Sequence, residues 1–189
     1  MNSLPNYLTI LRILLIPVFV LFYYIDIRHG HLIATVFFAL AGLTDWLDGY
    51  LARKLEVTSA FGAFLDPVAD KLMVATALIL IVDSNPTPYS GIWLALPAAV
   101  IVGREITISA LREWMAEVGA SSKVAVSMLG KVKTTAQMLA LVLLIYGQPV
   151  AGLNIAQIGL GLLYIAAILT LWSMINYLRA AWPALMAKG

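Results

Sequence analysis

Long apolar runs separated by short polar breaks make up most of this chain. A helix needs about 20 residues to cross a bilayer core of about 30 Å. Six mostly apolar segments have about this length: residues 5–25, 33–53, 64–82, 92–115, 127–147 and 153–178. The breaks carry turn-forming residues, such as Ser84-Asn85-Pro86 and Gly147-Gln148-Pro149. The pattern predicts an all-α, polytopic membrane protein with six transmembrane helices.

The composition supports this class and excludes several others. Hydrophobic residues make up 62% of the chain and charged residues 12%, whereas a typical soluble domain is about 25% charged. The chain has 189 residues and no repeat or linker, so we expect one transmembrane domain over residues 1–189. It has no cysteine, which excludes disulfides and thiolate metal sites. The net charge of +2 is too small to indicate a nucleic-acid partner.

The lysines and arginines are distributed unevenly between the two sides of the predicted bundle. Six spans place both termini on one side, and nine basic residues lie near that side: Arg53, Lys54, Lys71, Arg112, Lys123, Lys131, Lys133, Arg179 and Lys188. Arg28 is the only Lys or Arg in the opposite loops. Because basic residues are retained in the cytoplasm, we expect both termini to be cytoplasmic.

Four aspartates stand in this apolar chain near the predicted cytoplasmic side. Asp45 and Asp48 lie near the end of the second span, and Asp66 and Asp70 near the start of the third. Residues three or four apart share a helix face, so each pair lies on one face. A short polar connection around residues 54–60 folds the two spans into a hairpin, and the two pairs can therefore converge.

Four converging carboxylates in a membrane would repel one another and be costly to desolvate. Hard divalent cations remove both problems, because Mg²⁺ prefers oxygen ligands and shares them with substrate phosphates. Two metal ions held by carboxylates serve in-line displacement at phosphorus. The alternative is that some aspartates cap helices or reach the headgroups. It applies best to Asp66, which precedes Pro67, a residue suited to the first turn of a helix.

Glycines and one arginine extend the aspartate pattern. Gly49 and Gly62 allow a ligand to approach the backbone closely, and Arg53 can meet a phosphate through a bidentate fork. For Gly42 helix packing is the favoured interpretation. The full pattern reads Asp45-x2-Asp48-Gly49-x2-Ala52-Arg53-x8-Gly62-x3-Asp66-x3-Asp70.

This pattern resembles the signature of the CDP-alcohol phosphotransferase family, and every fixed position matches. Within the family, the resemblance to bacterial members that use glycerol 3-phosphate runs nearly end to end, through LPNYLTILRI, GREITISALREWM and GKVKTTAQM. It implies six transmembrane helices, a homodimer and a place in the bacterial cytoplasmic (inner) membrane.

The resemblance also implies roles for individual residues. Two Mg²⁺ ions, or Mn²⁺ in their place, would be held by the four aspartates, with Asp70 as the general base. The nucleotide of a CDP-linked donor such as CDP-diacylglycerol would lie near Gly49, Ala52, Arg53 and Gly62. Asn6 and Thr9 of the first span could line the same nucleotide pocket.

Further polar residues stand inside the other spans. Arg12 continues a polar stripe with Asn6 and Thr9 at three-residue steps, and it could equally anchor to lipid headgroups. In the fourth span, Arg104 should face the bundle interior, because lipid exposure of a charge is costly. Arg104 or Arg112 could form an internal ion pair with Glu105.

Two lysines open the fifth span. Lys131 and Lys133 are two residues apart and point about 200° apart on a helix, so we expect one to bind a phosphate and the other the lipid headgroups. Lys71 is expected to extend toward the headgroups, as a membrane lysine commonly does.

The basic residues suggest an anionic acceptor. Arg104, Arg112, Lys131 and Lys133 together fit glycerol 3-phosphate, whose hydroxyl would attack the donor and release CMP. The residues themselves leave two alternative functions open. One is a related phosphotransferase with another acceptor, such as inositol phosphate, serine or phosphatidylglycerol. The other is a membrane cation transporter, although transport usually places charges along a path near the midplane.

Overall fold

The computed structural model describes the backbone of residues 4–55, 60–118 and 128–186. Within these ranges it describes all side chains except those of residues 4–6, 46, 48–55, 60, 61, 63, 128, 129, 131 and 183–185. The described part folds into six helices: α1 (Leu4–Tyr24), α2 (Gly30–Leu55), α3 (Ala60–Ser84), α4 (Ile92–Glu117), α5 (Met128–Tyr146) and α6 (Ile155–Met186). This confirms the predicted all-α class and the number of helices.

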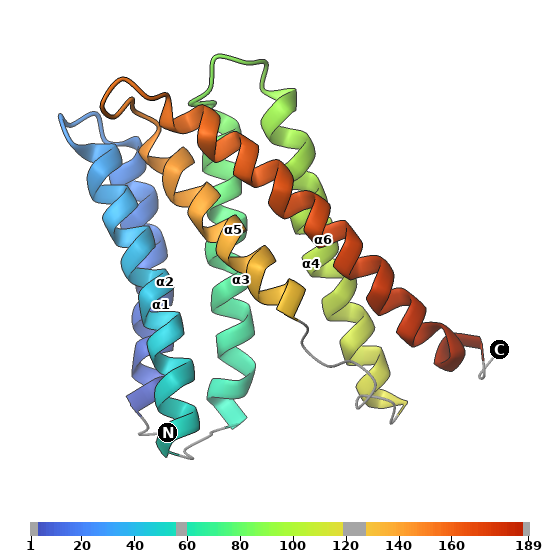
Figure 1. Cartoon of the computed structure of the whole chain (residues 1–189). Coiled ribbons are helices and arrows are strands. Elements are labelled where there is room, and N and C mark those ends of the chain that lie inside the picture. The colour runs from blue at the N-terminus through green and yellow to red at the C-terminus, as the bar shows by residue number, and fades with distance from the viewer. Residues whose placement is uncertain (1–3, 56–59, 119–127, 187–189) are drawn as a thin grey trace.

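The helices run alternately up and down (Figure 1). The connections after α1, α3 and α5 lie together at one end of the bundle. The ends of α2 and α3 that carry the aspartates point to the opposite end, where α1 also begins. The connection between α5 and α6 contains Gly147 and Gly152 at positive φ, which a glycine adopts without strain.

Three of the described helices are long and apolar enough to cross a membrane: residues Tyr7–Tyr24 of α1, Ile92–Glu117 of α4 and Ile155–Trp182 of α6. Shorter apolar stretches occupy Gly30–Asp45 of α2 and Val132–Tyr146 of α5. Together these stretches make the chain a membrane protein of helical class.

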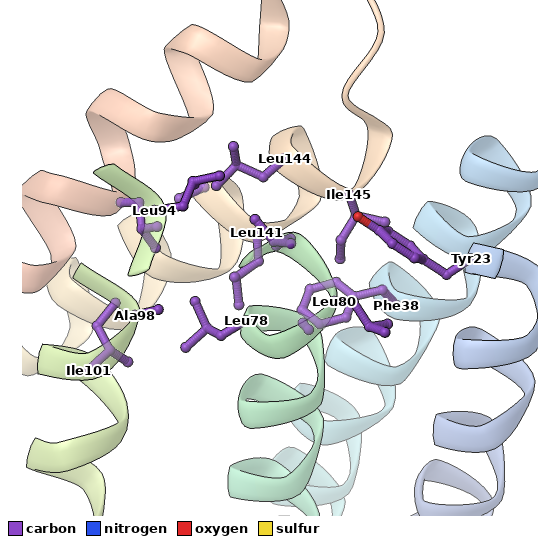
Figure 2. Packing of buried hydrophobic residues seen from close by; sticks show 14 of the residues in the cluster. Tyr23, Phe38, Leu78, Leu80, Leu94, Ala98, Ile101, Leu141, Leu144 and Ile145 are labelled. Atoms are coloured by element: carbon purple, nitrogen blue, oxygen red, sulfur yellow. The ribbon is translucent and has the colours of Figure 1, made fainter. Parts of the chain in front are cut away.

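A core of buried apolar side chains lies mainly in the half of the described bundle opposite the aspartates. Figure 2 shows side chains of this core from different helices, among them Tyr23, Phe38, Leu78, Leu94 and Leu144. All five are at most 5% exposed. Because lipid tails are as apolar as these side chains, close packing rather than water exclusion favours helix association in a bilayer. This half therefore holds the helices in place while the other half accommodates polar groups.

Two helix boundaries differ from those expected by four residues or more. α3 begins at Ala60, four residues earlier than predicted, so Pro67 lies inside the helix rather than in its first turn. Proline leaves the carbonyl four residues earlier without its helical partner, which membrane helices tolerate. α6 has 32 residues and continues to Met186. No Gly or Pro occurs between Leu162 and Trp182, so nothing in the sequence ends this helix at residue 178.

Candidate active site

Three carboxylates from two helices meet side chains of α1. Thr9 donates a hydrogen bond from its hydroxyl to Oδ1 of Asp66. Arg12 Nη1 lies 2.9 Å from Oδ1 of Asp45, and the same nitrogen forms an ion pair with Oδ1 of Asp70. The contact of one nitrogen atom with both carboxylates shows that α2 and α3 bring them together, as the hairpin prediction required.

These contacts decide two open alternatives. Asp66 lies inside α3, six residues after its start, so it is not a helix cap. Arg12 has a fully buried side chain, so the headgroup-anchor interpretation is wrong. The polar spacing of Thr9 and Arg12 on α1 instead marks the face that meets the aspartates.

A cavity of about 610 Å³ opens beside Asp45 and Asp70. Both carboxylates are about half exposed, at 48% and 46%. Most of the wall is apolar and comes from α2, α3 and α5, with Leu43, Met73 and Met138 among its residues. A Cβ at Gly42 would lie 2.9 Å from Cε of Met138, so the missing side chain lets α2 approach α5. The volume is in the usual range for a small-molecule site.

A second polar cluster joins α4 to α5. Glu105 accepts hydrogen bonds at Oε1 from Arg104 Nη1 at 2.9 Å and from Lys133 Nζ at 3.0 Å. Arg104 and Lys133 are both buried. The predicted internal ion pair therefore exists, with Arg104 and Lys133 as its cations. Arg104 faces the bundle interior, as expected.

Residues of α6 complete this cluster. Arg112 Nη2 donates to the hydroxyl of Tyr177 at 2.8 Å, and Arg104 Nη2 donates to Ser173 at 3.2 Å. The Tyr177 ring also lies beneath both guanidinium groups, 5.8 Å from Arg104 and 5.3 Å from Arg112, within the range of cation–π attraction. These side chains line a cavity of about 220 Å³.

The two cavities adjoin. Thr134 of α5 lines both the cavity beside the aspartates and the cavity of the basic cluster. An apolar cavity ending at carboxylates and a small cationic cavity thus share a wall. Such an arrangement can hold a lipid-linked, phosphate-containing molecule beside a second, anionic one.

Comparison with known proteins gives a consistent result. The family model for CDP-alcohol phosphatidyltransferase matches residues 2–172. This chain belongs to the CDP-alcohol phosphatidyltransferase family. It is 53% identical to a Pseudomonas fluorescens protein over 188 residues, which cover 99% of this chain and 94% of that protein. It is 55% identical to a Haemophilus influenzae protein over 185 residues, which cover 97% and 96%. Both relatives are named CDP-diacylglycerol–glycerol-3-phosphate 3-phosphatidyltransferase.

Family membership makes the chain a transferase of phospholipid biosynthesis and favours phosphoryl chemistry over the cation-transport alternative. Some predicted site residues have side chains outside the described part of the structure: Asn6, Asp48, Gly49, Ala52, Arg53 and Lys131. Gly62 is described and is buried in α3. The roles of these residues stay predictions from the family signature.

The metal ligand set also stays a prediction. Among the described side chains, no three His, Asp or Glu residues form a set that could hold a metal ion. Asp48, the fourth member of the signature, lies outside that search. The described carboxylates still fit the expected ions in chemistry, because they offer oxygen ligands that already converge on one positively charged nitrogen.

Some polar residues that line the two cavities were not predicted from the sequence. Ser173 and Tyr177 are four residues apart and so share a face of α6, a spacing that could have indicated the contact with α4. Gln137 also lines the larger cavity. Its Oε1 is buried and has no hydrogen-bond partner among the described groups.

Lys71 also differs from expectation. Its ammonium donates a hydrogen bond to Ser109 of α4, and the residue is only partly exposed. It connects α3 to α4 instead of extending toward the headgroups.

Proposed function

We propose that this chain transfers the phosphatidyl group from CDP-diacylglycerol to glycerol 3-phosphate, with release of CMP and formation of phosphatidylglycerophosphate. One observation carries the proposal: the apolar cavity at Asp45 and Asp70 shares Thr134 with a cationic cavity. The first suits a lipid donor and the second suits an anionic, water-soluble acceptor. The names of relatives at 50–55% identity over nearly the full chain agree with it.

The larger cavity supports the donor assignment. Its apolar wall between α2 and α5 can take an acyl chain, and its aspartates mark where the pyrophosphate would lie. By the family signature, the cytidine would lie near Gly49, Ala52, Arg53 and Gly62. The Arg53 guanidinium would then bind a donor phosphate.

The charge of the smaller cavity supports the acceptor assignment. Its described ionisable residues are Arg104, Arg112, Lys133 and Glu105, so three positive charges and one negative charge leave a net charge of +2. This balances the dianionic phosphate of glycerol 3-phosphate. Glu105 steadies two of the cations, and Tyr177 orients the third. Lys133 is thus the lysine we assign to the phosphate.

Asp45, Asp48, Asp66 and Asp70 would hold two Mg²⁺ ions, or Mn²⁺ in their place. When bound, such ions neutralise a pyrophosphate and stabilise charge on a leaving oxygen. Asp45 and Asp70 line the larger cavity and are about half exposed. Cations and substrate can therefore reach them through this cavity.

In the proposed reaction, the chain brings a hydroxyl and a phosphorus together. The basic cluster holds the acceptor's phosphate, so that its free primary hydroxyl points toward the aspartates. Asp70 accepts the hydroxyl proton while the oxygen attacks the β-phosphorus that carries diacylglycerol. The bond from this phosphorus to the oxygen bridging it to the α-phosphorus breaks, and CMP leaves with that oxygen. A positioned base is worth about 10²–10⁴ in rate.

We also propose a location and an orientation. The excess of Lys and Arg on one side supports cytoplasmic termini and an active site facing the cytoplasm. A cytoplasm-facing site in the bacterial inner membrane gives access to both a lipid and a soluble substrate. A homodimer stays a prediction from the family resemblance.

An acceptor panel tests the proposed function. Purified protein with CDP-diacylglycerol and Mg²⁺ should release CMP when glycerol 3-phosphate is added. Glycerol, serine and free inositol should give no release, because they bring no phosphate to balance the net charge of +2 in the cationic cavity. Release with inositol phosphate or phosphatidylglycerol, but not with glycerol 3-phosphate, would contradict glycerol 3-phosphate as the acceptor. It would not affect the assignment to the family.

The role of Tyr177 gives a second prediction. Tyr177→Phe removes the hydrogen bond to Arg112 and should raise the KM for glycerol 3-phosphate about threefold to tenfold, because such a bond contributes about 0.5–1.5 kcal/mol. The KM for CDP-diacylglycerol should change little. Arg53→Ala should instead raise the KM for CDP-diacylglycerol more than the KM for glycerol 3-phosphate.

A matched control lies on the same helix. The Tyr164 hydroxyl is buried and has no hydrogen-bond partner among the described groups, so Tyr164→Phe should leave both KM values unchanged. Equal KM changes for the two substrates in Tyr177→Phe would remove Tyr177 from the acceptor site.

The aspartates give a third prediction. Asp70→Asn should lower turnover by at least about 10²-fold, the range expected for loss of a general base, while CDP-diacylglycerol still binds. Asp45→Asn should instead raise the Mg²⁺ concentration that gives half-maximal rate. If Asp70→Asn keeps more than about a tenth of the rate, another group takes the proton.

A further inference from the structure

Arg12 occupies an unusual position for a membrane arginine. Its side chain is 0% exposed, although α1 is an outer helix with many lipid-accessible residues. One nitrogen, Nη1, contacts carboxylates from two other helices, Asp45 on α2 and Asp70 on α3. Neither of these two carboxylates is on its own helix, so Arg12 joins three helices at the site.

The carboxylates separate Arg12 from the cavity. Asp45 and Asp70 line the cavity and are about half exposed. Arg12 is not part of the cavity wall. The guanidinium therefore lies on the protein side of the carboxylates, and a cation that enters from the cavity approaches them from the other side.

The charge of Arg12 needs compensation. A guanidinium is a cation, and burying one without an opposite charge beside it is costly. The signature aspartates carry four negative charges, of which Arg12 offsets one. Another contact from α1 to these aspartates comes from the neutral hydroxyl of Thr9. Arg12 is thus the cation that α1 supplies to the site.

We propose that Arg12 is a positioning residue that holds Asp45 and Asp70 together while the site contains no divalent cation. Without it, the carboxylates repel one another across α2 and α3 until a metal ion arrives. Arg12 therefore stabilises the metal-free protein more than the metal-loaded protein. The inference rests on the proposed function in one respect, namely that these aspartates bind divalent cations.

Thermal unfolding tests this inference without measuring activity. The chain has five tryptophans, so intrinsic fluorescence of the detergent-purified protein reports unfolding. Arg12→Met should lower Tm in EDTA by about 5 °C or more, because breaking a buried ion pair is strongly destabilising. In saturating Mg²⁺ the loss should be less than about half as large, since the metal ions then hold the carboxylates. An equal loss in both conditions would overturn the proposal.

Arg104→Met is the matched control. Arg104 is also a buried arginine in an ion pair, with Glu105 as its partner, but it contacts none of the described aspartates of the signature. Its loss of Tm should be the same in EDTA and in Mg²⁺. A loss that depends on Mg²⁺ as strongly as that of Arg12→Met would show a general effect of metal on the fold and would overturn the proposal.

Two further variants cover the case in which Arg12→Met does not fold. Arg12→Lys keeps the charge but has a shorter reach, and it should show a smaller, still Mg²⁺-dependent loss. Adding Asp45→Asn to Arg12→Met removes one repelling charge and should restore part of the metal-free Tm. Failure of both variants to show these effects would contradict the inference.

The wild-type protein separates this inference from the proposed function. If Mg²⁺ does not raise the wild-type Tm and no acceptor supports CMP release, the proposed function fails. If the wild type is a Mg²⁺-dependent enzyme and Arg12→Met loses Tm equally in both conditions, the positioning role alone fails.

Discussion

Charges buried among membrane helices must be paired, and this constraint organises the polar half of the bundle. Arg12 meets Asp45 and Asp70 on one side, while Glu105 meets Arg104 and Lys133 on the other. The contacts of Arg12 join α1 to α2 and α3, and the contact of Glu105 with Lys133 joins α4 to α5. These charges therefore also determine which helices meet. The fold and the site consequently depend on the same contacts.

One end of the bundle is filled with apolar side chains, and the other end contains the candidate active site. Large apolar side chains such as Phe38, Leu78 and Leu144 fill the end opposite the aspartates (Figure 2). The other end leaves two adjoining cavities, one apolar with carboxylates and one cationic. A close-packed half limits helix movement, because packed interiors deform little. The cavities can therefore keep a fixed relation to each other in a bundle of only six described helices.

Much of this arrangement could be predicted from the sequence because it depends on local spacing. The span length predicted the six helices, and steps of three and four residues placed Asp45, Asp66 and Asp70 on facing surfaces. The partners of those residues could not be predicted. Whether Arg12 faces lipid or aspartates depends on the rotation of α1 against α2 and α3, and no local pattern fixes that rotation. The same holds for Tyr177. From the sequence alone, this tyrosine could equally lie at the membrane interface, where aromatic residues are common.

If the two adjoining cavities hold donor and acceptor as proposed, both substrates are bound at the same time and react directly. Initial rates of CMP release, measured while both CDP-diacylglycerol and glycerol 3-phosphate are varied, test this claim most directly. We expect intersecting reciprocal plots, and no exchange of labelled CMP into CDP-diacylglycerol when the acceptor is absent. Parallel plots together with that exchange would indicate a covalent phosphatidyl-enzyme and would contradict direct transfer between the two cavities.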